Sequence, residues 1–207
     1  MTKKKINKTE IDRFFYEKKA LSEGFSVVAG IDEAGRGPLA GPVVAAAVII
    51  RDPLFEERVD DSKKLTPRMR ERAYLDILNR CDVGVGVVGP EKIDRLNIFQ
   101  ATLLAMKMAL DELDKRPDHL LIDGKMPVEV PESRTYLFQG EEKSMSIAAA
   151  SVVAKVTRDK IMTIEDKKYP IYGFVKHKGY GTRMHMEAIR KNGFSPIHRK
   201  TFGPFGG

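Results

Sequence analysis

The feature that most constrains the fold of this chain is a stretch near its start, in which two apolar runs flank a pair of acids and a glycine-rich turn. The run at residues 27–31 leads directly into Asp32 and Glu33, and the run at residues 43–50 follows a segment containing three glycines and two prolines. This order predicts a strand, an acidic tip, a tight turn and a second strand. A surface hairpin with two solvated acids is the alternative, but Arg36 and so many glycines exceed what a hairpin needs. Acids beside a backbone with few side chains suit a metal ion and a phosphate.

The bulk properties bound the class of protein. The 207 residues are enough for a sizeable core, and we expect one domain over residues 1–207. Lys and Arg number 36 against 29 Asp and Glu, a net charge of +7, which permits binding to nucleic acid without requiring it. Cys81 is the one cysteine, so an internal disulfide cannot form, which is typical of a reducing compartment. The basic residues 1–5 precede no apolar stretch of signal-peptide or membrane-spanning length, so we expect a cytoplasmic protein with no membrane partner.

Hydrophobic periodicity and turn signals predict that strands alternate with helices along most of the chain. We expect strands over residues 25–31, 43–50, 83–88, 119–122 and 136–138, and helices over residues 9–22, 66–79, 91–113, 143–168 and 184–191. Thr9 and Thr66 are the expected N-caps of the first two helices. This mixed order predicts a three-layer α/β domain followed by a small helical C-terminal appendage.

A second acid follows a second buried strand, because Asp123 comes directly after the apolar residues 120–122. Parallel strands in an α/β sheet place such ends at one edge, where sites form. A lone acid in this position is also often a helix cap or a loop residue. Neighbouring residues of a regular strand face opposite ways, so Asp32 and Glu33 can converge only if their strand bends or ends there. Gly30 and Gly35 would permit that bend.

A fourth acid lies on a predicted helix, where Ser151, Lys155 and Asp159 are spaced by four and therefore share one face. A Lys–Asp pair at this spacing is also a common surface salt bridge. Several carboxylates gathered in a basic protein require a cation, and oxygen ligands without cysteine or clustered histidine favour Mg²⁺ or Mn²⁺. Two such ions could hold a phosphodiester between them.

Five segments then carry a family resemblance. In order along the chain they are residues 30–42, 61–63, 121–124, 149–159 and 172–182. Together they resemble type 2 ribonuclease H in its bacterial form, ribonuclease HII. The resemblance implies a ribonuclease H-like three-layer fold with a mixed five-stranded sheet, in which residues from about 170 to 207 form a substrate-binding helical and loop extension. It implies a monomer that hydrolyses the RNA strand of RNA–DNA hybrids and incises DNA duplexes at single ribonucleotides. Two Mg²⁺ or Mn²⁺ ions would act, leaving 5'-phosphate and 3'-hydroxyl ends.

The resemblance also assigns roles to particular residues. The four metal-binding acids of the family correspond to Asp32, Glu33, Asp123 and Asp159. Gly35, Arg36 and Gly37 correspond to the loop that reads the ribose at an RNA–DNA junction, and Tyr180 to the tyrosine against the adjacent deoxyribose.

The chemistry of these residue types suits the assigned roles. Glycine lets a backbone approach the 2'-hydroxyl that separates RNA from DNA, and Arg36 can hold a phosphate. The flanking glycines favour a presented Tyr180 ring over a loop aromatic packed on the core. Phosphate or carboxylate partners are also expected at four further residues, Lys63, Ser151, Lys155 and Arg158. For Arg158 a solvated surface charge is an equal alternative.

Other interpretations fit less well. Ribonuclease HIII, a sister class, has a long extra N-terminal domain and a glutamate as its last acid, whereas about 28 residues precede the first motif here and the last acid is Asp159. Residues 84–89 match the dinucleotide fingerprint GxGxxG, but these glycines lie inside a predicted strand. The four histidines show no metal-site spacing; only His177 lies in the Tyr180 loop. In a non-catalytic nucleic-acid binder, four acids on one face would repel phosphate unless a metal neutralised them.

Overall fold

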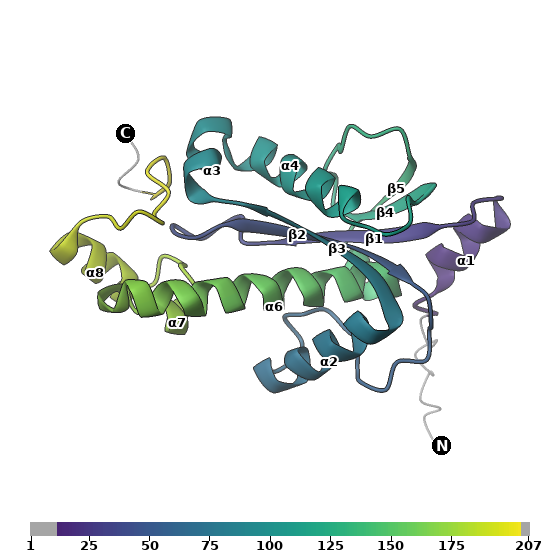
Figure 1. Cartoon of the computed structure of the whole chain (residues 1–207), viewed down its shortest axis with the longest axis horizontal. Coiled ribbons are helices and arrows are strands. Elements are labelled where there is room, and N and C mark those ends of the chain that lie inside the picture. The colour runs from purple at the N-terminus through teal and green to yellow at the C-terminus, as the bar shows by residue number, and fades with distance from the viewer. Residues whose placement is uncertain (1–11, 204–207) are drawn as a thin grey trace, which may run out of the picture.

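The computed structural model describes residues 12–203, which form a mixed five-stranded sheet between two layers of helices (Figure 1). The strands are β1 (Val28–Ala34), β2 (Val43–Ile50), β3 (Cys81–Val88), β4 (His119–Asp123) and β5 (Ser133–Leu137). Their order across the sheet is β3-β2-β1-β4-β5. The pairs β1–β2 and β2–β3 are antiparallel, whereas β1–β4 and β4–β5 are parallel. The expected three-layer α/β fold is therefore confirmed.

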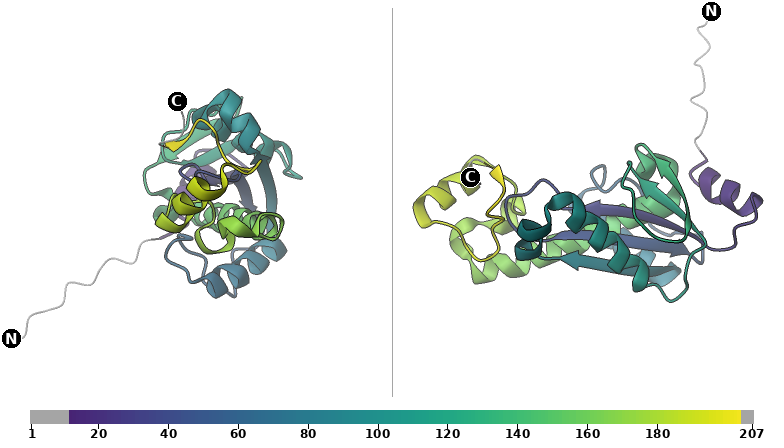
Figure 2. Two further views of the ribbon diagram at one scale, coloured as in Figure 1. Left: turned by 90° about the vertical axis from the view of Figure 1, so that its left-hand side faces the viewer. Right: turned by 90° about the horizontal axis from the view of Figure 1, so that it is seen from above.

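Helices cover both faces of the sheet. They are α1 (Phe15–Ser22), α2 (Pro67–Arg80), α3 (Pro90–Leu96), α4 (Ile98–Asp111), α5 (Gly140–Lys143), α6 (Met145–Lys168), α7 (Phe174–His177) and α8 (Arg183–Asn192), with a 3₁₀ turn η1 (Pro170–Tyr172). Helices α3 and α4 cover one face, and α2 and α6 cover the other (Figure 1). Helices α7 and α8 gather at one end of the molecule, away from α1 (Figure 2).

The long helix α6 packs against strands β1 and β2 of the sheet. The side chains of Ala148, Ala149, Ala150 and Ala154 are fully buried against the strands, as their small size predicts. The approach is so close that a Cβ on Gly30 of β1 would lie 2.2 Å from the backbone carbon of Ser146. This contact requires glycine in β1, and it fixes α6 beside the strand that carries Asp32 and Glu33.

Three expectations need correction. The predicted helix over residues 91–113 is two helices, because Asn97 adopts φ 69° and its side chain caps α4 by accepting a hydrogen bond from the Gln100 amide. The first strand is shifted three residues toward the C-terminus relative to the prediction, so that it runs through both acids to Ala34. The predicted helix over residues 143–168 is found as α6, which begins at Met145 after its cap Ser144, and the one-turn helix α5 in front of it was not predicted. The cap predicted at Thr9 lies outside the described residues.

The glycines of residues 84–89 have a packing role. A Cβ at Gly84 would lie 1.9 Å from the carbonyl oxygen of Ala109, and one at Gly86 would lie 1.9 Å from that of Ala105. Both glycines thus let β3 contact the backbone of α4, which explains the spacing without a nucleotide. No helix within residues 12–203 is long and apolar enough to cross a membrane.

Candidate active site

Strands β1 and β4 bring two of the predicted acids to one edge of the sheet. They run parallel, and their pairing ends at Ile31 opposite Ile122, so Asp32 and Asp123 follow at the same level. A cavity of about 180 Å³ opens there. It is lined by Asp32, Glu33, Ala34, Gly35, Ser62, Lys63, Asp123, Ser151, Lys155, Arg158 and Tyr180. Most of the residues predicted for the site are therefore brought together.

Asp32 and Glu33 reach this cavity although their strand does not end. Pairing of β1 with β2 continues to Ala34 opposite Val44. On its other side, the pairing of β1 with β4 ends at Ile31, so the edge of β1 beside both acids has no neighbouring strand in the described part of the chain. The strand therefore does not end before the two acids, and its open edge lies beside both of them.

The cavity is electrostatically costly for its acids. Burial raises the pKa of Asp32 well above its ordinary value, and the charges of Glu33 and Asp123 raise it further, against hydrogen bonds from the Glu33 amide and Ser151. Burial also raises the pKa of Glu33, although Arg36, 3.3 Å away, and Lys63 oppose the shift. Buried carboxylates held against one another in a cavity are typical of functional sites.

Glu141, at the start of α5, is a further acid of this group that the sequence analysis missed. Burial raises the pKa of its carboxyl, and the charge of Asp123 contributes to the rise. Its Oε1 atom lies 3.7 Å from Nζ of Lys63, and its Oε2 atom is buried without a hydrogen-bond partner among the described residues. The Gly140 amide donates a hydrogen bond of 2.7 Å to Oδ1 of Asp123, which ties α5 to the end of β4. The feature of the sequence that could have indicated Glu141 is a pair of acids directly after Gly140, just ahead of the long helix.

Asp159 lies apart from the other three predicted acids. Nζ of Lys155 donates to its Oδ1 atom at 2.7 Å, which is the salt bridge weighed as the alternative. Asp159 lines a neighbouring groove of about 840 Å³, together with Lys160, Lys176 and Lys178, and Lys155 lines both spaces. The structure therefore brings Asp32, Glu33 and Asp123 together with Glu141. Because Glu141 is a glutamate, the identity of the last acid no longer separates the two sister classes.

The cavity fits a hard divalent cation by the chemistry of its donors. Its acidic lining offers carboxylate oxygens and neither cysteine nor histidine, which suits Mg²⁺ or Mn²⁺. The unpartnered Oε2 atom of Glu141 is a spare ligand beside Asp123. Within residues 12–203, no three His, Cys, Asp or Glu side chains are already arranged as a ligand set. Like charges repel when no cation lies between them.

The 35–37 loop and Tyr180 face one another at the cavity. Gly35 has φ 98°, and a Cβ there would lie 2.1 Å from Nε of Arg158, so the position requires glycine. A Cβ at Gly37 would lie 3.9 Å from Cε1 of Tyr180. The Tyr180 ring is 46% exposed, and its backbone is fixed because its amide donates to the His177 carbonyl and its own carbonyl contacts His185 Nδ1 at 2.9 Å. The loop presents backbone to solvent opposite a flat, accessible ring.

The remaining predicted residues divide into exposed and buried groups. The Lys63 side chain is 81% exposed. The partial loss of water around its ammonium group would by itself lower its pKa, but nearby carboxylates, Asp61 and Glu141 foremost, raise the pKa overall. Ser151 is buried, and its hydroxyl oxygen lies 2.9 Å from that of Ser62. Arg158 is only 1% exposed and donates to the carbonyls of Pro42 and Ala40. This burial excludes the alternative that Arg158 is a solvated surface charge, and the hydrogen bonds found at its guanidinium go to backbone carbonyls.

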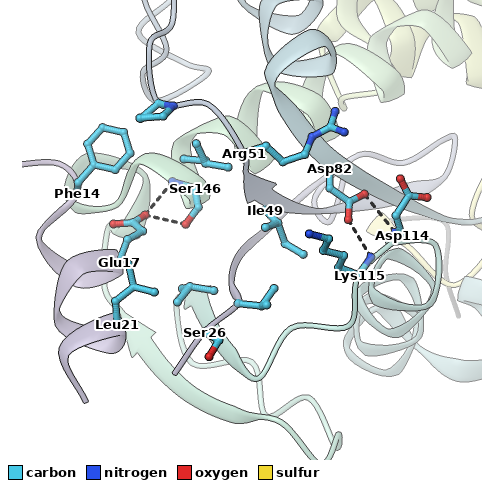
Figure 3. A pocket seen from close by; sticks show the side chains of 14 residues that line it. Phe14, Glu17, Leu21, Ser26, Ile49, Arg51, Asp82, Asp114, Lys115 and Ser146 are labelled. Carbon is cyan, nitrogen blue, oxygen red and sulfur yellow. Dashed lines mark hydrogen bonds between the residues drawn. The ribbon is translucent and has the colours of Figure 1, made fainter. Parts of the chain in front are cut away.

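A separate cavity of about 560 Å³ lies at the opposite ends of β1 and β2 (Figure 3). Several of its polar groups are already used by the fold, although Oε2 of Glu17 has no hydrogen-bond partner among the described residues. Oε1 of Glu17 accepts hydrogen bonds from the Ser146 amide and hydroxyl, and the Asp82 carboxylate accepts the amides of Asp114 and Lys115. The cluster of mutually repelling acids at the other end of the sheet is therefore the better candidate for chemistry.

Comparison with known proteins identifies the family. The model of the family described as Ribonuclease HII matches residues 29–204, which include both strand-end acids and the Tyr180 loop. The chain belongs to the ribonuclease HII family. Ribonuclease HII of Acetivibrio thermocellus is 50% identical over 207 residues, covering 97% of this chain and 80% of that protein. Ribonuclease HII of Geobacter sulfurreducens is 53% identical over 188 residues, covering 90% and 87%.

Solved structures agree with this ribonuclease HII assignment. The ribonuclease H2 of Pyrococcus horikoshii superposes with a TM-score of 0.73 at 29% identity, covering 86% of this chain and 94% of that one. Ribonuclease HII of Archaeoglobus fulgidus, solved in complex with PCNA, gives 0.72 at 26% identity, covering 86% and 96%. A ribonuclease HIII solved with Mn²⁺ gives 0.66 at 20% identity, covering 86% and 67%, and shares the fold.

Membership in the ribonuclease HII family establishes the activity class of this chain. It is a ribonuclease H, a divalent-metal-dependent endonuclease that hydrolyses RNA in RNA–DNA hybrids. In the described structure, carboxylates and a glycine-rich loop meet at the cavity at the edge of β1 and β4.

Proposed function

We propose that this ribonuclease HII incises duplex DNA at single embedded ribonucleotides as well as hydrolysing RNA–DNA hybrids. The observation that supports this most is the 35–37 loop facing Tyr180 over the acids. A backbone with glycine on both sides of Arg36 can contact a 2'-hydroxyl closely, whereas the flat ring of Tyr180 suits the neighbouring sugar that lacks one. Recognition of one ribose beside one deoxyribose needs no run of ribonucleotides.

We propose further that Asp32, Glu33, Asp123 and Glu141 hold two Mg²⁺ or Mn²⁺ ions. Bound there, such ions would supply an activated water and stabilise charge on the leaving oxygen, giving 5'-phosphate and 3'-hydroxyl ends. The raised pKa of Asp32, caused by burial and by its acidic neighbours, means that neutralising positive charge would stabilise the ionised cavity. Asp159 belongs to the salt bridge with Lys155 in this proposal and orients that lysine at the wall of the cavity.

The basic residues then serve the phosphate backbone. The Arg36 and Lys63 side chains are 43% and 81% exposed at the cavity mouth, so either can contact phosphate as well as a carboxylate. The groove beside α6 and α7 carries Lys160, Lys176 and Lys178 together with two acids, Glu71 and Asp159, so basic residues outnumber acids there. We assign residues from about 170 to 207 to this substrate-binding extension. The duplex substrate is the one partner we propose, bound by a monomer.

The test uses two radiolabelled 20–30-base-pair duplexes, one an RNA–DNA hybrid and the other DNA with a single ribonucleotide. The proposal expects both to be cut with Mg²⁺ or Mn²⁺ and neither with EDTA, and product ends should carry 5'-phosphate and 3'-hydroxyl groups. An all-DNA duplex of the same sequence is the control. Cutting of the hybrid alone would leave the ribonuclease H activity intact but overturn the single-ribonucleotide proposal.

A further inference from the structure

Two buried arginines hold the backbone of the segment that contains the 35–37 loop. Arg199, which comes from the C-terminal part of the chain and is 1% exposed, donates to the carbonyls of Gly35 at 2.6 Å, Arg36 at 3.0 Å and Gly41 at 2.9 Å. Arg158 of α6 donates to the carbonyls of Pro42 at 2.9 Å and Ala40 at 3.1 Å. Five carbonyls between residues 35 and 42 are thus bonded to two guanidinium groups.

Both hydrogen-bond donors in this arrangement are charged guanidinium groups, whose removal from water costs more free energy than that of a neutral donor. Neither Arg199 nor Arg158 forms a salt bridge with a described carboxylate; backbone carbonyls are their hydrogen-bond partners. Burial, and then the charge of Arg158, lower the pKa of Arg199 to about 9. Burying a guanidinium is unfavourable unless its hydrogen bonds are satisfied in good geometry. The planar fork of arginine meets three carbonyls at once, which the single ammonium of lysine cannot do in the same way.

The direction of the hydrogen bonds determines the direction of the loop amides. In a planar trans peptide unit the C=O and the next N–H point opposite ways. Since the carbonyls of Gly35 and Arg36 point at the buried Arg199, the amides of Arg36 and Gly37 point away from it, toward the outside. These two amides donate to no described residue, whereas those of Leu39 and Gly41 donate to the carbonyls of Gly179 and Ile197. The loop therefore holds two neighbouring free donors in a fixed direction.

We propose that Arg199 is a positioning residue that aims the amides of Arg36 and Gly37 at the ribose and so sets discrimination between ribonucleotide and deoxyribonucleotide. This rests on the proposed reading of a single ribonucleotide by the 35–37 loop. Arg199 does not contact substrate in this view. It links the C-terminal segment to the loop, 164 positions earlier, so that two parts of the chain that are distant in sequence determine one recognition surface.

The test compares wild type with Arg199→Lys, which keeps the positive charge but not the three-way fork. Binding of a duplex with one ribonucleotide is measured against binding of the same all-DNA duplex, in EDTA so that neither is cut. We expect wild type to prefer the ribonucleotide and Arg199→Lys to lose about tenfold of that preference, about 1.4 kcal/mol, with little change on the all-DNA duplex. Arg51→Lys is the matched control, because Arg51 donates to a single carbonyl, that of Cys81, at the far end of the sheet.

The outcomes separate the two proposals. If wild type binds both duplexes equally, the single-ribonucleotide function fails, and this proposal fails with it. If wild type discriminates and Arg199→Lys discriminates equally, only the positioning role is overturned. A second measurement needs no variant and covers the case in which Arg199→Lys does not fold. In NMR spectra of wild type, the amide signals of Arg36 and Gly37 should shift differently with the two duplexes, and identical shifts would contradict the proposal.

Discussion

The ammonium group of Lys155 lies 2.7 Å from Oδ1 of Asp159, one turn further along α6, whereas Glu141 has a buried Oε2 atom with no hydrogen-bond partner among residues 12–203. We therefore expect Glu141→Gln to lower kcat more than Asp159→Asn. Loss of a group that only orients a metal ligand typically costs 10–100-fold, so removal of a ligand should cost roughly 100-fold or more, and Asp159→Asn about tenfold or less. Cleavage of a hybrid over a Mn²⁺ titration measures both. A larger loss for Asp159→Asn would restore Asp159 to the metal site.

A second prediction concerns the stability cost of the active site. Burial and the charges of Glu33 and Asp123 raise the pKa of Asp32, so its ionised form is disfavoured in the folded state at neutral pH. In EDTA, Asp32→Asn should therefore have a higher free energy of unfolding than wild type, by at least about 1 kcal/mol. For a chain of this size that raises the melting temperature by roughly 2–4 °C. The gain should shrink as the pH falls toward the ordinary carboxyl pKa.

Adding a divalent ion should reverse the order of the melting temperatures of wild type and Asp32→Asn. Mn²⁺ bound to the folded protein alone stabilises it by mass action, so it should raise the melting temperature of wild type more than that of Asp32→Asn. Equal melting temperatures in EDTA, or equal responses to Mn²⁺, would show that Asp32 is not held in a repulsive, cation-dependent cluster.

The third prediction concerns acid pH and the histidines under Tyr180. Nε2 of His185 and Nε2 of His198 lie 3.0 Å apart, and burial together with His185 lowers the pKa of His198 from 6.5 to about 4. As the pH falls, the unfolded chain takes up this proton at a higher pH than the folded protein does. The stability that neutral His198 contributes is therefore fully present above about pH 6.5 and is lost as the pH falls toward 4. The loss is up to about 3 kcal/mol. His198→Asn should flatten the decline of unfolding free energy between pH 6.5 and 4; an unchanged slope would contradict the assignment.

Tyr180 supplies the fourth prediction. Tyr180 is exposed opposite Gly37, and backbone hydrogen bonds hold the residue in place, while its ring makes no hydrogen bond with the described residues and lies 5.9 Å from the Arg158 guanidinium. Tyr180→Ala should therefore remove a substrate contact without loosening the loop, and lower incision at a single ribonucleotide about tenfold more than cleavage of a continuous hybrid, a difference of about 1.4 kcal/mol. Tyr180→Phe is the matched control and should keep most of the preference. Equal losses on both substrates would contradict a role at the junction.

The sequence predicted the parts of the site that follow from strand pattern and local composition. Apolar runs ending in Asp32 and Asp123 indicated parallel strand ends at one edge, and the structure has β1 beside β4 in that arrangement. The break at Asn97 was missed because apolar periodicity continues across it while its positive φ leaves no periodic signal. Glu141 was missed because α5 is one turn long, too short for periodicity, and its position depends on the Gly140–Asp123 hydrogen bond.

Burial of charge was also beyond the sequence. Arginine is almost never fully buried unless its groups are paired. The expectations for Arg158, a phosphate or carboxylate partner or a solvated surface charge, did not include burial against backbone carbonyls, and no role was predicted for Arg199. Their partners are backbone carbonyls of residues 35–42 rather than acids of recognisable spacing. Only the closed fold, in which the C-terminal segment lies against the glycine-rich turn, brings these groups together.

The central claim is that the carboxylates at the end of β1 and β4 bind the ions that cut beside a ribonucleotide. The most direct measurement is Mn²⁺- or Mg²⁺-dependent incision of a duplex containing one ribonucleotide, by wild type and by Asp123→Asn. The same duplex should bind to both proteins in EDTA. We predict incision by wild type and a loss of roughly 100-fold or more in Asp123→Asn, with binding retained. Cleavage by Asp123→Asn at the wild-type rate would contradict the account.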